Sequence, residues 1–173
     1  PDSIIAVDAT SSLAGQQIII EDTDVVYASV QKCFGLPAGL AVMICSPKAI
    51  ERAQQINEKA HYNSLMFIRE NALQWQTHYT PNVLNIYLLM ATMKKYAGIN
   101  KVDELVKFRY ESWLAFVSQH SQLEILTSNV AVQSRTVITL KSTPEMVTAI
   151  KEKAKSAEIV LGNGYGQWKK NTF

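Results

Sequence analysis

Residues 25–45 read VVYASVQKCFGLPAGLAVMIC, and this stretch decides the fold class. Two apolar runs enclose a polar turn that contains Gln31, Lys32 and two glycines. Continuous apolar runs of this length are typical of strands buried on both faces, as in a parallel or mixed sheet. Four such runs predict strands in the first third of the chain: Ile4–Val7, Ile18–Ile20, Val25–Ala28 and Leu40–Cys45. This part of the chain is therefore predicted to be α/β.

Capping signals predict helices in the rest of the chain. Ser46, Thr80 and Thr143 each precede a proline, which suits the first position of a helix. The helix opened by Thr80 is predicted to run to Gly98 and, because it is apolar nearly all round, to be largely buried. Asn100 can cap a long amphipathic helix. Three later strand-like runs complete the predicted order: Leu123–Leu126, Thr136–Leu140 and Glu158–Leu161.

The order of elements changes near Gly98. Strands dominate the beginning of the chain, whereas a β-α-β order follows this glycine. We therefore expect residues 1–98 to belong to one α/β domain and residues 99–173 to a small α+β domain. The chain starts at Pro1 without a methionine, directly before a predicted strand, so we expect it to be a piece of a longer protein.

Composition and charge exclude several classes of protein. Hydrophobic residues make up 47% of the 173 residues and charged residues 18%, which excludes a disordered chain. A net charge of +2 without a run of Lys or Arg argues against a nucleic-acid partner. The most apolar stretch, Val83–Met93, is shorter than the roughly 20 residues that span a bilayer, and no export signal is visible. Cys33 and Cys45 are expected to be reduced thiols in a cytoplasmic protein.

Asp8 follows the first predicted strand and precedes a run of hydroxyl residues that begins at Thr10. In open α/β sheets, ligands bind outside the carboxyl ends of the strands, so a carboxylate there can face a ligand. The alternative is a plain turn, because Asp and Ser commonly end strands by hydrogen bonding to the backbone. Turn chemistry alone accounts for these residue types, so both interpretations stay open.

Gln31 and Lys32 follow the strand predicted at residues 25–28, and Lys32 has apolar neighbours in Val30 and Phe34. A lysine buried in apolar company loses proton affinity and becomes a nucleophile that forms a Schiff base with a carbonyl. The alternative is a lysine whose amine reaches water. The second arrangement is the commoner one, because buried lysines are rare.

Tyr79 and Thr80 precede Pro81 at a predicted helix start, where free backbone N–H groups can bind a phosphate. The alternative is a simple helix cap, and one threonine can serve both purposes. His78 is close enough to be a minor candidate, although the three histidines lack metal-ligand spacing and no metal site is expected. The glycine-rich residues 162–166 have no helix pattern after them, which argues against a dinucleotide-binding loop.

The segments 7–12, 27–32 and 35–40 together resemble the class V aminotransferases, which are pyridoxal-phosphate (PLP) enzymes. The subgroups they resemble most are the phosphoserine and the serine–pyruvate or alanine–glyoxylate aminotransferases. The Thr-Pro-Asn at residues 80–82 and the glycines at residues 162–166 extend the resemblance over nearly the whole chain. It implies the α/β PLP-dependent transferase fold, with the end of the large-domain mixed sheet followed by an incomplete small α+β domain.

The resemblance also implies roles for the residues near the sheet. Lys32 would hold PLP through a Schiff base and carry the proton between the substrate Cα and the cofactor. Asp8 would pair with the pyridine nitrogen and keep it protonated, which makes the ring an electron sink. Thr10 and Gln31 would lie beside the cofactor, with Gln31 near its phosphate.

The resemblance further implies that Thr80, together with Tyr79, holds the phosphate from the neighbouring subunit of a homodimer with its active site at the interface. The implied reaction moves an amino group between an amino acid and a 2-oxo acid, with the phosphoserine/3-phosphohydroxypyruvate type favoured and no nucleic-acid or membrane partner. Cys33 and Tyr79 stand where phosphoserine aminotransferases usually have asparagine, which keeps the serine–pyruvate or alanine–glyoxylate type open. A non-catalytic protein of this fold is a further alternative, against which Lys32 and Asp8 argue. A nucleotide-binding α/β domain would need a glycine-rich turn after its first strand, which is absent here.

Overall fold

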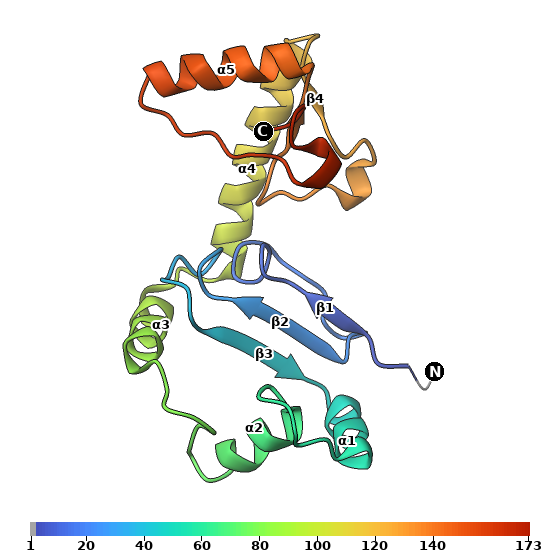
Figure 1. The fold of residues 1–173 in the computed structure, drawn as a ribbon, viewed down its shortest axis with the longest axis vertical. Helices are drawn as coiled ribbons and strands as arrows, with labels where there is room; N and C mark the ends of the chain where they lie inside the picture. The colour runs from blue at the N-terminus through green and yellow to red at the C-terminus, as the bar shows by residue number, and fades with distance from the viewer. Residues whose placement is uncertain (1–2) are drawn as a thin grey trace. The chain divides into compact units, whose positions relative to one another are not determined.

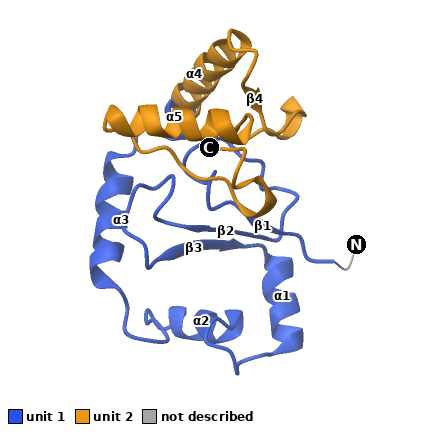
Figure 2. Cartoon of the chain, turned by 45° about the horizontal axis from the view of Figure 1, so that its top comes forward, with its two compact units in different colours: residues 1–102 blue, residues 103–173 orange. Residues whose placement is uncertain are grey.

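The structure, a computed structural model, describes residues 3–173 and divides into two compact units between Val102 and Asp103 (Figure 2). Helix α4 (Ile99–Ser118) begins in unit 1 and continues in unit 2. Within the described residues, no helix is both long and apolar enough to cross a membrane. The assignment of residues 1–98 and 99–173 to a large and a small domain stays a prediction.

The sheet of unit 1 is mixed, which is one of the two arrangements that the apolar runs predict and the one that the family resemblance implies. Its strand order is β1-β2-β3, with β1 parallel to β2 and β2 antiparallel to β3 (Figure 1). Tyr27 of β2 lies opposite Asp8 of β1 and Met43 of β3. The strands are β1 (Ala6–Asp8), β2 (Val25–Ser29) and β3 (Ala41–Cys45).

Burial of the strands differs from the prediction. Val26 and Ala28 of the central strand are buried, with exposed fractions of 2% and 0%. Met43 and Ile44 of β3 are instead 44% and 46% exposed, so the prediction that all strands are buried on both faces is wrong. An apolar run indicates that a strand can be buried, whereas its actual burial depends on which other elements pack against that strand.

The strand predicted at Ile18–Ile20 is also wrong, because these residues form irregular chain. Ile19 is 82% exposed, and the carbonyl of Ile20 accepts hydrogen bonds from the backbone and the hydroxyl of Thr23. These bonds close a tight turn before β2. A run of β-branched residues forms a strand only where it can hydrogen-bond to the edge of a neighbouring strand, however high its β-propensity is.

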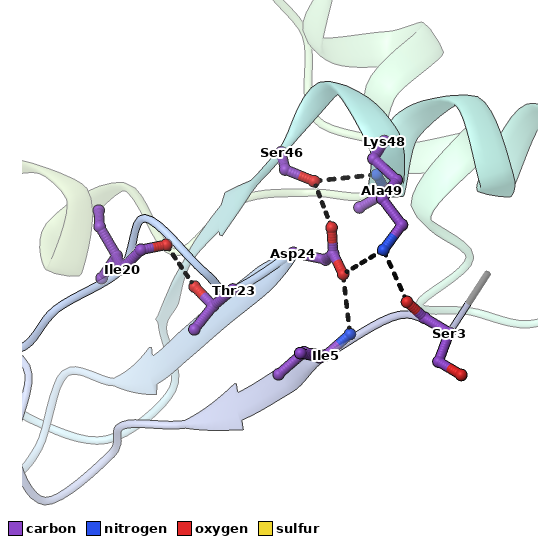
Figure 3. A network of polar contacts seen from close by, with 8 residues as sticks. All are labelled: Ser3, Ile5, Ile20, Thr23, Asp24, Ser46, Lys48 and Ala49. Atoms are coloured by element: carbon purple, nitrogen blue, oxygen red, sulfur yellow. Dashed lines mark hydrogen bonds and ion pairs between the residues drawn. The ribbon is translucent and has the colours of Figure 1, made fainter. Parts of the chain in front are cut away.

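Asp24 anchors the amino end of the β1–β2 pair to the first helix (Figure 3). Its carboxylate accepts hydrogen bonds from the Ile5 amide (2.9 Å), the Ser46 hydroxyl (3.0 Å) and the Lys48 amine (3.2 Å). The Ile5 amide is the main cause that lowers the pKa of Asp24, and Lys48 and Ser46 act in the same direction. The carboxylate is therefore charged at neutral pH, and both of its oxygens accept hydrogen bonds.

Three helices follow the sheet in unit 1, and the cap predicted at Ser46 is confirmed. The Ser46 hydroxyl accepts the Ala49 amide at 3.1 Å, and Pro47 occupies the first helical position. The chain after α1 then forms α2, which Ser64 caps. The three helices are α1 (Pro47–Ile56), α2 (Leu65–Ala72) and α3 (Val83–Lys95).

Three predictions about α3 and α4 are wrong. Asn82, rather than Thr80, caps α3, and its side chain accepts the Asn85 amide at 3.1 Å. The apolar residues of α3 are largely exposed, since only Asn85 is buried along the described helix. Asn100 lies inside α4 rather than before it, and its Oδ1 accepts a hydrogen bond from Gln17 at 2.8 Å.

Unit 2 contains a two-stranded antiparallel sheet and a capped helix. Thr143 caps α5 as predicted, and Val147 on that helix is buried. The runs predicted as strands at residues 123–126 and 136–140 correspond to the shorter strands β4 and β5. The prediction of a strand at residues 158–161 is wrong, because that segment is irregular. Thr172 supplies the additional pairing with β5 instead. The elements are β4 (Glu124–Ile125), β5 (Leu140–Lys141), α5 (Pro144–Ser156) and the short 3-10 helices Val130–Val132 and Gly166–Trp168.

Candidate functional site

Asp8 ends β1 in a hydrogen-bonded turn, as the plain-turn interpretation predicts. Its Oδ1 accepts the Thr10 amide at 2.9 Å, and the Thr10 hydroxyl in turn accepts the Ser29 amide at 3.4 Å. Hydrogen bonding from the Thr10 hydroxyl, then from its amide, lowers the pKa of Asp8, with a smaller contribution from the Tyr27 hydroxyl. The same turn therefore keeps an exposed carboxylate charged at the carboxyl end of β1.

Lys32 lies in a tight loop that returns the chain from β2 to β3. The loop is closed by backbone hydrogen bonds from Leu36 to Val30 (3.1 Å) and from Gly35 to Lys32 (2.9 Å). Gly35 has φ +70°, a conformation that glycine adopts readily. Gln31 and Lys32 are both exposed in this loop, so the buried-amine interpretation is wrong and the Lys32 amine reaches water.

The parallel pairing of β1 and β2 brings two of the predicted site residues to the same sheet edge. Parallel strands end at the same edge, so Asp8 at the end of β1 and the Lys32 loop after β2 share it. Thr10 connects the two strand ends through its bond to Ser29. A carboxylate and a primary amine at one sheet edge can bind a cationic ring nitrogen and a carbonyl group, respectively.

Thr80 and Tyr79 lie on an irregular segment between α2 and α3, and both are exposed. Thr80 lines an open hollow of about 760 Å³, with His78 and Trp75 among the other lining residues. Within the described residues, no hydrogen bond or ion pair joins Thr80 to Asp8. The structure thus brings Asp8 and Lys32 to one edge, whereas Thr80 lines a hollow formed by residues between 72 and 86.

Asn85 connects the two regions and was missed by the sequence analysis. Its side-chain amide donates to the carbonyls of Pro37 and Ala38, both at 3.1 Å, although these residues are far away in sequence. Gly39, with φ +112°, ends this turn. An added Cβ there would lie 3.3 Å from Nδ2 of the Asn82 side chain. The start of α3 is therefore fixed to the turn that follows Lys32.

The weaker sequence features have structural roles. An added Cβ at Gly164 would lie 1.8 Å from the hydroxyl of buried Thr172, so the chain passes too closely there for any side chain. His61 pairs with Glu58 at 2.9 Å, and His120 stacks on Phe116. Over residues 3–173, no group of three or more His, Cys, Asp or Glu residues could hold a metal ion.

Comparisons with known proteins bear on the family and the fold of the chain. A family model described as aminotransferase class-V matches residues 1–165. A phosphoserine aminotransferase from Rhodococcus opacus is 37% identical over 92 residues, which cover 51% of this chain and 25% of that protein. One from Corynebacterium glutamicum is 37% identical over 108 residues, which cover 60% of this chain and 29% of the relative.

A solved phosphoserine aminotransferase from Cytophaga hutchinsonii superposes with a TM-score of 0.84 at 29% identity. The superposition covers 98% of this chain and 48% of that structure. The described fold is therefore the fold of PLP-dependent aminotransferases. The chain spans about half the length of this solved relative, and the aligned segments are under a third of the two sequence relatives.

Proposed function

The chain belongs to the class V aminotransferases, and from this premise we propose that it forms part of an enzyme that moves an amino group between an amino acid and a 2-oxo acid. The phosphoserine/3-phosphohydroxypyruvate reaction, a step of serine biosynthesis, is the proposed type. The similarity to phosphoserine aminotransferases at 37% identity supports this choice. The shared sheet edge of Asp8 and Lys32 is the observation that carries the proposal.

PLP fits the residues at this edge. The lowered pKa of Asp8 leaves a carboxylate, the group that pairs with a protonated pyridine nitrogen. Lys32 offers an exposed amine, and among the described ion pairs none involves it. Thr10 and Gln31 border the same edge and would contact the cofactor, with Gln31 near its phosphate. When bound, PLP supplies an electron sink for the negative charge that develops at the substrate Cα.

The protein residues would bind the cofactor and move protons. Asp8 would hold the proton on the pyridine nitrogen, and the Thr10 bonds that keep Asp8 ionised would support this role. Lys32 would hold the cofactor covalently through Nζ and, once released by the substrate amine, accept the Cα proton. The flexible side chain of an exposed lysine allows both positions.

A homodimer is part of the proposal. Thr80, with Tyr79, would hold the cofactor phosphate of the neighbouring subunit. The exposed apolar residues of α3, including Val83, Leu84 and Tyr87, favour a protein partner on this helix.

Cys33 and Cys45 are free thiols, which supports the proposed cytoplasmic location.

An assay of amino-group transfer by the assembled protein that contains this chain tests the proposed function. Phosphoserine as donor with a panel of 2-oxo acids should give turnover that depends on added PLP. Alanine with glyoxylate, assayed in parallel, tests the alternative reaction type. Faster turnover with alanine and glyoxylate would overturn the phosphoserine assignment, and no turnover with either pair would overturn the enzymatic proposal.

A further inference from the structure

Four aromatic rings surround the segment that carries Thr80. Tyr62 precedes α2 and Phe67 lies on it, whereas His78 and Tyr79 directly precede Thr80. We propose that Tyr62 is a positioning residue, whose ring and carbonyl hold Thr80 in the conformation that binds phosphate. This inference rests on the proposed function, in which Thr80 binds the cofactor phosphate.

The ring contacts fix the side chain next to Thr80. Tyr62 stacks on Tyr79 with ring centroids 4.7 Å apart and planes inclined by 19°. His78 and Phe67 meet Tyr79 edge-on, at 4.9 Å and 6.2 Å. Offset stacks and edge-to-face pairs are the favoured aromatic geometries and stabilise a structure beyond the area that they bury. Tyr79 is therefore held by three rings, two of which come from the chain before and within α2.

Polar contacts fix the backbone of the same segment. His78 Nε2 donates to the Tyr62 carbonyl at 2.9 Å, because a carbonyl oxygen can only accept. The Thr77 hydroxyl donates to the Tyr79 carbonyl at 2.6 Å, which orients the peptide group that leads into Thr80. Tyr62 thus contacts the segment through both its ring and its backbone.

The cluster matters because Thr80 lies on irregular chain. A segment without helix or strand hydrogen bonds loses conformational entropy when a ligand orders it, and this loss lowers the affinity. Contacts that order the segment beforehand remove part of this cost and raise affinity. Tyr62 is 67% exposed and outside the helices, so replacing its ring should not unfold unit 1.

The test compares Tyr62→Leu, which removes the ring, with Tyr62→Phe, which keeps the stack. In the holoprotein, Tyr62→Leu should raise the dissociation constant for PLP about two- to tenfold, the loss expected for one aromatic pair, whereas Tyr62→Phe should match the wild type. In the cofactor-free protein, amide hydrogen exchange of residues 77–82 should accelerate in Tyr62→Leu only. Unchanged affinity or unchanged exchange in Tyr62→Leu would overturn the proposal.

A double-mutant cycle separates this inference from the proposed function. If Tyr62 acts through Thr80, adding Tyr62→Leu to Thr80→Val should cause no further loss of PLP affinity. The same loss in both backgrounds would mean a general structural effect and would overturn the positioning role. If Thr80→Val alone leaves PLP affinity unchanged, the phosphate role of Thr80 in the proposed function is wrong and the positioning role falls with it.

Discussion

Asn85 offers a direct test of how the site is held together. It is 2% exposed, and its amide group donates two 3.1 Å hydrogen bonds to the turn that follows Lys32. Asn85→Asp keeps the size of the side chain but replaces the donor with a carboxylate oxygen that faces two carbonyl acceptors. The turn and the start of α3 should then separate.

The magnitude follows from the lost contacts. Two hydrogen bonds at about 0.5–1.5 kcal/mol each sum to about 1–3 kcal/mol, and an unpaired buried carboxylate adds to this. We expect Asn85→Asp to lower the free energy of unfolding of unit 1 by at least about 2 kcal/mol at neutral pH. The loss should shrink in acid, because a protonated carboxyl can donate to one of the carbonyls.

Urea unfolding followed by circular dichroism measures the change, and amide exchange of residues 30–40 locates it. Asn63→Asp is the matched control, since Asn63 is exposed and should stay within about 0.5 kcal/mol of the wild type. Equal stability of the two variants, or unchanged exchange in the Lys32 turn of Asn85→Asp, would refute the idea that Asn85 fixes this turn.

Three further predictions concern other parts of the chain. Asp8→Asn should leave PLP bound but slow turnover sharply, because a neutral amide cannot hold the proton on the pyridine nitrogen; an unchanged rate would remove Asp8 from the site. Gly164→Ala should destabilise unit 2 by about 1–3 kcal/mol, measured by thermal unfolding, because its Cβ would overlap the Thr172 hydroxyl; wild-type stability would contradict the close approach. The lowered pKa of Asp24 implies stabilisation that is present above pH about 4 and lost as the pH falls through the folded-state pKa. Urea midpoints measured against pH should therefore decline less steeply in acid for Asp24→Asn, and parallel curves would count against this.

Local signals in the sequence predicted much of the fold. Ser46 and Thr143 were identified as caps because each supplies a hydroxyl before a proline, and both caps form. Thr80 carries the same signal, yet Asn82 caps α3. Asparagine is as good a cap as threonine, so residues 80–82 offer two possible helix starts, and local sequence cannot choose between them.

Long-range contacts could not be predicted from the sequence. The hydrogen bonds of Asn85 reach a turn that is remote in sequence, and no local pattern marks them. Ile18–Ile20 has strand propensity but no strand to pair with. Parallel pairing alone brings Asp8 and the Lys32 loop to one edge, whereas the roles of these two residues in a site stay a prediction. The exposure of Lys32 depends on the tight loop and was not visible in the apolar residues around it.

Borohydride reduction of the PLP-loaded protein, followed by peptide mapping, identifies the lysine that holds the cofactor. We expect one reduced pyridoxyl adduct, located on Lys32, and its disappearance in Lys32→Arg. An adduct on another lysine, or bound cofactor that leaves no adduct after reduction, would contradict the assignment of Lys32 as the residue that holds the cofactor.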